Sequence, residues 1–222
     1  MIVAERKSIP ELIDILKDHK KILVLGCGTC VTVCLAGGER EVSIISSALR
    51  IASKVKGLSF EIDELTIERQ CDNVFIEQAA EAIESSEAVL SLGCGAGVQA
   101  IAERYARKPV YAGLNTAFLG ILEERGMWTE KCAACGSCML HKYGGICPVT
   151  RCAKHMLNGP CGGSREDRCE VRPDRPCAWQ LIYQRLKDIG QLDRLRQIES
   201  PKSWSSSLDS GPRVIIREDH RI

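Results

Sequence analysis

Residues 132–177 read CAACGSCMLHKYGGICPVTRCAKHMLNGPCGGSREDRCEVRPDRPC and hold eight of the thirteen cysteines of the chain. The stretch opens with C-x2-C-x2-C and continues to a Cys-Pro pair, and its last four cysteines are separated by eight, seven and seven residues. Only five large aliphatic side chains lie among these cysteines, too few to build a hydrophobic core. We therefore expect bound metal to hold the stretch together. The expected ligands are Cys132, Cys135, Cys138, Cys147, Cys152, Cys161, Cys169 and Cys177.

An iron–sulfur cluster is the first interpretation of this pattern. Three thiolates at C-x2-C-x2-C can bind one cubane, and a later Cys followed by Pro supplies a further ligand in bacterial ferredoxins. Here the Cys-Pro pair follows after a longer gap than in ferredoxins, so the spacing does not fix the ligand sets. Structural zinc is the second interpretation, bound by four thiolates or by three together with His141 or His155. We favour two 4Fe–4S clusters in this region, ahead of one cluster with one zinc, zinc alone and a disulfide framework.

The N-terminal sequence MIVAERKSIP has charged residues from position 5 and no apolar run of signal-peptide length. No stretch of 18 uncharged apolar residues occurs elsewhere. We therefore expect a cytoplasmic protein without a membrane span. Thiols stay reduced in that compartment, which favours metal sites over disulfides.

The charge differs between the two halves of the chain. Residues 1–128 contain 14 Lys and Arg against 18 Asp and Glu, whereas residues 129–222 contain 16 against 11. A positive excess beside anionic metal–thiolate clusters would stabilise them. The alternative is a nucleic-acid surface, but the Arg residues stand singly and no aromatic residues alternate with them. We expect no nucleic-acid partner.

The first half of the chain alternates apolar strand-like and helical segments. Ser8 and Glu11 form a capping box for a helix that ends near His19. Strands are predicted at 21–26, 58–65, 88–93 and 110–114, and helices at 39–54, 73–86, 96–106 and 117–124. This order predicts a doubly wound, mostly parallel four-stranded α/β sheet, of flavodoxin-like or Rossmann-like type. We assign residues 1–128 to this domain, 129–199 to a small cysteine-rich domain with a C-terminal helix, and 200–222 to a tail.

Two of the strand ends share the sequence Gly-Cys-Gly, at 26–28 and 93–95. A dinucleotide-binding G-x-G-x-x-G fingerprint is one interpretation of both loops. It fails because Val31 and Val98 stand where the third glycine belongs. We therefore give nucleotide binding a low rank.

Five cysteines follow three of the predicted strands, and they are Cys27, Cys30, Cys34, Cys71 and Cys94. The carboxyl ends of parallel strands meet at one edge of the sheet, where open α/β sheets bind their ligands. We expect four of the five to bind another iron–sulfur cluster, although the sequence does not decide which four. The alternatives are buried free cysteines that pack as small apolar residues and a redox-active pair at Cys27 and Cys30.

The C-terminal end has two parts. Residues 178–198 predict an amphipathic helix that Gly190 divides, and its apolar stripe is more often packed on its own domain than on a partner. The Ser-rich tail from Ser200 carries Trp204 and the apolar run 214–216. It is predicted to be a partner-binding arm, with a disordered tail as the alternative.

The motifs GCGTCVTVCLAGGE, ERQCD and GCGAGVQ precede the ordered string C-x2-CG-x-C, GGICP, RC-x-K, NGPCGG, CE and CAWQLIYQRLK. Over about residues 20–198 this pattern resembles the small iron–sulfur subunit of acetogen-type methylenetetrahydrofolate reductase. Its second half resembles the cysteine-rich domain named for the C-terminal part of that reductase. The metal in this domain family is iron, zinc or both, so the resemblance leaves the metal open.

The resemblance implies an electron-transfer subunit without catalytic residues of its own. The partner would be a catalytic subunit that carries FMN and reduces methylene- to methyltetrahydrofolate in one-carbon metabolism of the Wood–Ljungdahl type. Electrons would come from a ferredoxin or another redox subunit. The rival from another class is a zinc-stapled interaction module of the same complex without a redox role, and a thiol-dependent or nucleotide-dependent enzyme ranks last.

Overall fold

The computed structural model of the chain describes residues 1–207 and 211–220. The chain divides into two units, Met1–Thr129 and Glu130–Ile222. We describe each unit by itself.

A parallel sheet of four strands forms the centre of the first unit, in the order β3-β2-β4-β5. These strands are β2 (Lys21–Cys27), β3 (Glu61–Ile67), β4 (Ala88–Ser91) and β5 (Val110–Ala112). Residues 22–27 of β2 are all buried, as expected for a central strand that is covered on both faces. The predicted α/β class and the four-stranded parallel sheet are confirmed. The second strand is displaced, since β3 begins three residues after the predicted start at 58.

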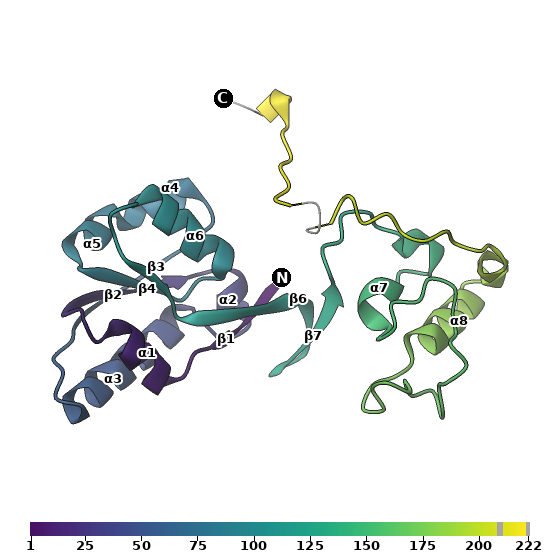
Figure 1. The fold of residues 1–222 in the computed structure, drawn as a ribbon, viewed down its shortest axis with the longest axis horizontal. Coiled ribbons are helices and arrows are strands. Elements are labelled where there is room, and N and C mark those ends of the chain that lie inside the picture. Colours follow the sequence, from purple (N-terminus) through teal and green to yellow (C-terminus); the bar gives the residue numbers. More distant parts are fainter. Residues whose placement is uncertain (208–210, 221–222) are drawn as a thin grey trace. The chain divides into compact units, whose positions relative to one another are not determined.

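Helices cover both faces of this sheet (Figure 1). Alternate residues of β2 point to opposite faces, so Ile22 and Val24 join one core and Leu23 and Leu25 join the other. The helices of the first core are α1 (Ile9–Leu16) and α3 (Glu39–Val55). Those of the second core are α4 (Asn73–Ile76), α5 (Ala80–Ser85) and α6 (Gly95–Arg104). The sheet is therefore doubly wound, as predicted.

A second sheet follows the order β1-β6-β7, with β1 (Ile2–Arg6), β6 (Leu114–Glu124) and β7 (Met127–Cys132). β1 pairs antiparallel with β6. The prediction of a helix at 117–124 was therefore wrong, and β1 was not predicted at all. The backbone of residues 114–119 hydrogen-bonds to a strand more than 100 positions away in sequence, and such a partner overrides local helix propensity.

The second unit has little regular structure. It contains α7 (Pro148–Arg151), α8 (Ala178–Asp188) and short 3₁₀ turns at Leu140–Lys142, Leu192–Arg196 and Glu218–His220. α8 ends before Gly190, whose φ is +66°, so the predicted break is confirmed. The apolar face of α8 packs on its own unit, and the buried cluster there is Tyr143, Cys177, Trp179, Ile182 and Leu186.

Candidate metal centres

The sheet-edge cysteines of the first unit lie at the point where the strand order reverses. β2 lies between β3 and β4. The chain passes from β2 to β3 on one side and then crosses to β4 on the other side of β2. Cys27 is the last residue of β2, and Cys94 caps the N-terminus of α6 after β4. Open α/β sheets bind ligands at such a switch point.

Cys71 belongs to the same group. Cys71 is exposed, but partial desolvation raises the pKa of its thiol, and the thiols of Cys94 and Cys27 raise it further. The thiols of Cys27, Cys71 and Cys94, which come from three separate connections, are thus within electrostatic range of one another. A thiophilic metal would reverse the effect, because a bound cation favours the thiolate form.

A buried glutamine holds the loop that carries Cys71. The Gln70 side-chain amide donates to Leu25 O at 2.8 Å, and its oxygen accepts from Ser91 Oγ at 2.5 Å. These bonds join the residue before Cys71 to the ends of β2 and β4. A Cβ on Gly93 would stand 2.3 Å from Gln70 Oε1, so only glycine leaves room for this side chain. Gln70 was not among the predicted site residues, and its one signal in the sequence was its place directly before a candidate ligand.

The two remaining cysteines of the first unit follow β2 on the short helix α2 (Cys30–Val33). Cys30 is half-buried, whereas Cys34 is buried. The Cys34 thiol lies 3.6 Å from Val31 O and 3.8 Å from Ala4 O in β1. Burial raises the pKa of Cys34. Cys34 thus contacts the core beside β1.

Four cysteines of the second unit line one small cavity of about 20 Å³. Cys152 ends α7, and Cys177 caps the N-terminus of α8. Cys161 and Cys169 come from the loop between these helices, where Cys177 N donates to Asp167 O at 2.7 Å and closes the loop. The ligand candidates brought together here are Cys152, Cys161, Cys169 and Cys177.

Cationic side chains lie beside these thiols. Lys154 lines the same cavity and forms an ion pair with Glu170. The Glu170 carboxylate raises the pKa of Lys154, and the Cys161 thiol adds to this effect. The ion pair with Asp174 raises the pKa of Arg172, and the Cys169 thiol adds a smaller effect in the same direction. Positive charges at this place favour thiolates and hence metal binding.

The other four cysteines of this unit lie on two segments. Cys132 ends β7, Cys135 and Cys138 follow it, and Cys147 caps the N-terminus of α7. Ala134 N donates to Cys132 Sγ at 3.3 Å, a contact of the kind that backbone amides make with metal-bound sulfur. Within 1–207 and 211–220, no group of three or more Cys, His, Asp or Glu side chains has the arrangement of a single-ion site.

The donor set fits a thiophilic metal. All thirteen cysteines are free thiols rather than disulfides, and four of them line one cavity. A space of this size holds about one water-sized sphere. Since no group of these donor side chains in the described residues has the arrangement of a single-ion site, the four sulfurs would have to move to bind one ion, and a four-iron cluster requires the walls to move outward. The proposed zinc ligand His155 is exposed, and its Nδ1 is within hydrogen-bonding distance of Val149 O.

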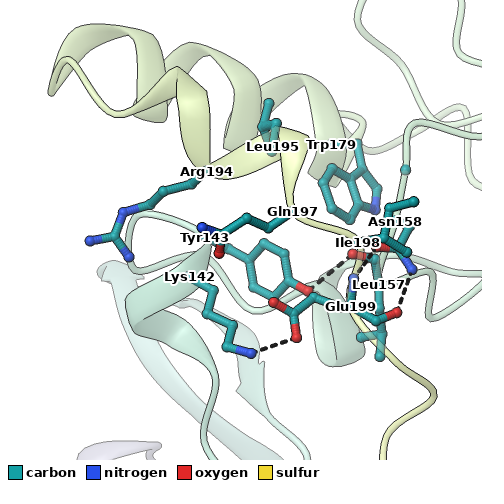
Figure 2. Close-up of a pocket in the computed structure, with 11 residues that line it drawn as sticks. Lys142, Tyr143, Leu157, Asn158, Trp179, Arg194, Leu195, Gln197, Ile198 and Glu199 are labelled. Atoms are coloured by element: carbon teal, nitrogen blue, oxygen red, sulfur yellow. Dashed lines mark hydrogen bonds and ion pairs between the residues drawn. The ribbon is translucent and has the colours of Figure 1, made fainter.

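A second cavity of the same unit, of about 130 Å³, lies beside the aromatic pair Tyr143 and Trp179 (Figure 2). The Tyr143 hydroxyl donates to Leu157 O at 3.0 Å, and Lys142 pairs with Glu199 at 2.5 Å. Burial raises the pKa of Tyr143 to about 12, with smaller effects from Glu199 and Cys147. Asn158 also bonds to the backbone of Glu199, so several polar groups around this cavity bond to one another, which indicates a structural role (Figure 2).

None of the helices in the described parts of the chain is long and apolar enough to cross a bilayer. Comparison with curated proteins and with solved structures gives no match. Residues 111–205 match the sequence model of a family described as methylene-tetrahydrofolate reductase C terminal. The matched segment contains all eight cysteines of residues 132–177. This part of the chain is therefore related to the C-terminal part of methylene-tetrahydrofolate reductase.

Proposed function

We propose that this chain is the electron-transfer iron–sulfur subunit of a cytoplasmic methylenetetrahydrofolate reductase complex. It would relay electrons to a flavin on a separate catalytic subunit. The observation that carries the proposal is the convergence of four cysteines on one cavity within the segment related to that reductase. A folate-reducing complex needs an electron path, and a cysteine-bound cluster supplies one-electron transfer when it is bound.

The geometry supports a division of the thirteen cysteines into three centres. Cys152, Cys161, Cys169 and Cys177 share one cavity, which leaves Cys132, Cys135, Cys138 and Cys147 for a second centre. In the first unit, Cys27, Cys71 and Cys94 are within electrostatic range of one another, and Cys30 on α2 is the fourth candidate. Cys34 is the spare thiol, because its sulfur contacts carbonyl groups of the core.

The residues around the thiols serve two purposes in this proposal. Lys154 and Arg172 offset the negative charge of thiolate ligands. Tyr143 and Trp179, whose ring centroids are 5.5 Å apart, pack with Cys177 in one buried cluster and keep water away from its thiol. Burial and hydrogen bonds of this kind set the potential of a metal centre.

One observation favours the zinc-stapled interaction module as the second candidate. The cavity lined by the four cysteines has a volume of about 20 Å³, closer in size to one ion than to a four-iron cluster, and four thiolates are a common structural zinc site. In that case the metal would only stabilise the second unit, and the chain would bind the catalytic subunit without carrying electrons.

The apolar residues of the tail support a partner. Val214, Ile215 and Ile216 are 79%, 81% and 58% exposed, an unusual state for three successive β-branched residues. We propose that this segment binds the flavin-containing subunit, and that a ferredoxin or another redox subunit is the electron donor.

Anaerobic purification separates the two candidates. The electron-transfer function predicts iron and acid-labile sulfide in the protein and a broad visible absorption band that bleaches on reduction. A colourless protein with stoichiometric zinc would support the interaction module instead.

A further inference from the structure

The C-terminal tail contacts the loop that carries Cys132, Cys135 and Cys138. Lys202 Nζ donates to Ser137 O at 2.9 Å, and Ser206 Oγ donates to Cys135 O at 3.1 Å. Arg213 Nη1 donates to Ala134 O at 2.9 Å. Three side chains of the tail therefore bind three backbone carbonyls within residues 134–137 of this loop.

The contact is close and leaves little freedom. Arg213 Nη1 also donates to Ser206 O at 2.8 Å, which joins two parts of the tail over the loop. A Cβ on Gly136 would stand 2.2 Å from that same carbonyl oxygen of Ser206. Gly136 has a φ of +80°, which glycine adopts readily. Glycine between the cysteines thus lets the tail approach the loop backbone.

The bound carbonyls determine where the amide groups of the loop point. In a trans peptide the C=O and N–H bonds point in opposite directions. When these carbonyls face the tail, the N–H groups of the same peptides point away from the tail. Several N–H groups that point to one side can surround an anion, as in a backbone nest. Ala134 has a φ of +51°, a strained value for a residue with a side chain. The hydrogen bond from Arg213 to its carbonyl offsets that strain.

We propose that Lys202, Ser206 and Arg213 are positioning residues of the metal centre built on Cys132, Cys135 and Cys138. They fix the loop in the conformation that directs its amides to the ligand sulfurs. Lys202 and Arg213 also bring two positive charges to the backbone of the loop that carries these cysteines. This inference shares one requirement with the proposed function, namely that a metal binds Cys132, Cys135 and Cys138. It does not require that the metal carries electrons.

The test measures how fast each cysteine becomes accessible when metal is withdrawn. Anaerobically purified full-length protein is mixed with a chelator and a thiol-alkylating reagent, and peptide mass spectrometry follows the labelling of each cysteine. The variants are Arg213→Gln and Ser206→Ala. Their matched controls are Arg196→Gln, an exposed arginine that forms an ion pair with nearby Asp193, and Ser205→Ala, whose hydroxyl contacts Ser203.

We expect the triplet to be labelled about tenfold faster in Arg213→Gln and about threefold faster in Ser206→Ala, the sizes of a charged and a neutral hydrogen bond. Cys161 and Cys169 should be labelled at the wild-type rate, as should every cysteine in both controls.

Three other outcomes would overturn the inference, and they are distinguishable. If the triplet is protected but is labelled at equal rates in Arg213→Gln and Arg196→Gln, the positioning role is rejected. It is also rejected if all eight cysteines of the second unit are labelled faster to the same extent. Both results are compatible with a metal centre at the triplet. Immediate labelling of the triplet in the wild-type protein before chelator is added rejects the metal centre itself, and the inference with it.

Discussion

Ser91 and Gln70 are joined by a buried hydrogen bond of 2.5 Å, from Ser91 Oγ to Gln70 Oε1. Ser91 Oγ also accepts from Gly93 N at 3.1 Å, in the turn that leads to Cys94. Gln70 precedes Cys71, so one small network controls the positions of two candidate ligands. Such buried polar groups are costly when they lose their partners.

Replacement of Gln70 by leucine should destabilise the first unit by about 2–4 kcal/mol, because Leu25 O and the Ser91 hydroxyl would lose their partner. Urea unfolding followed by circular dichroism measures this change. Gln99→Leu is the matched control, since the Gln99 side chain is exposed and reaches only Gly95 O of its own helix. A Gln70→Leu variant as stable as the control would contradict the role of the network.

Cys34 and Cys71 should respond differently to alanine substitution. Cys71→Ala is expected to remove the metal of the first unit, because its thiol lies near those of Cys27 and Cys94. Cys34→Ala should keep that metal and lower stability by only about 1 kcal/mol, the cost of a small cavity. Metal analysis by mass spectrometry of both variants checks this. Loss of metal in Cys34→Ala would show that Cys34 is a ligand.

Much of the fold followed from local sequence patterns. The buried run 21–26 and the alternation of strands and helices predicted the parallel sheet, and Gly190 predicted the break after α8. β1 and β6 were missed because their pairing joins residues far apart in the chain. No periodicity within either segment reports such a partner.

The sequence predicted that cysteines are the candidate ligands, but it did not predict which cysteines share one centre. The cysteines stood out by number and spacing, whereas the convergence of Cys152, Cys161, Cys169 and Cys177 depends on how the loop between α7 and α8 closes. Supporting residues such as Gln70, Lys154 and Arg213 carry no motif. Their roles follow only from contacts between distant segments.

Stability of the second unit should fall at high pH because of Tyr143. Its folded-state pKa is raised from 10.0 to about 12, so below pH 10 the hydroxyl is neutral in both states. Between these values the unfolded state ionises and the folded state does not, which lowers stability by up to about 1.4 kcal/mol per pH unit. Unfolding of Tyr143→Phe should lack this component, whereas the exposed Tyr183→Phe should keep it. Equal pH profiles for the two variants would contradict the assignment.

Removal of metal should unfold the second unit and spare the first. The buried cluster of the second unit has only five residues, so binding energy at the cysteines replaces most of a core. The sheet of the first unit has two larger apolar cores. After chelation, hydrogen exchange should become fast in α8 and stay slow in β2. Retained protection in α8 would mean that the second unit folds without metal.

Native mass spectrometry of the intact, anaerobically purified protein tests most directly whether iron–sulfur clusters are bound. We predict a mass above that of the polypeptide by bound iron and sulfide, with zinc allowed at the centre of Cys152, Cys161, Cys169 and Cys177. A mass equal to that of the metal-free chain, or one lowered by disulfide formation, would contradict this prediction.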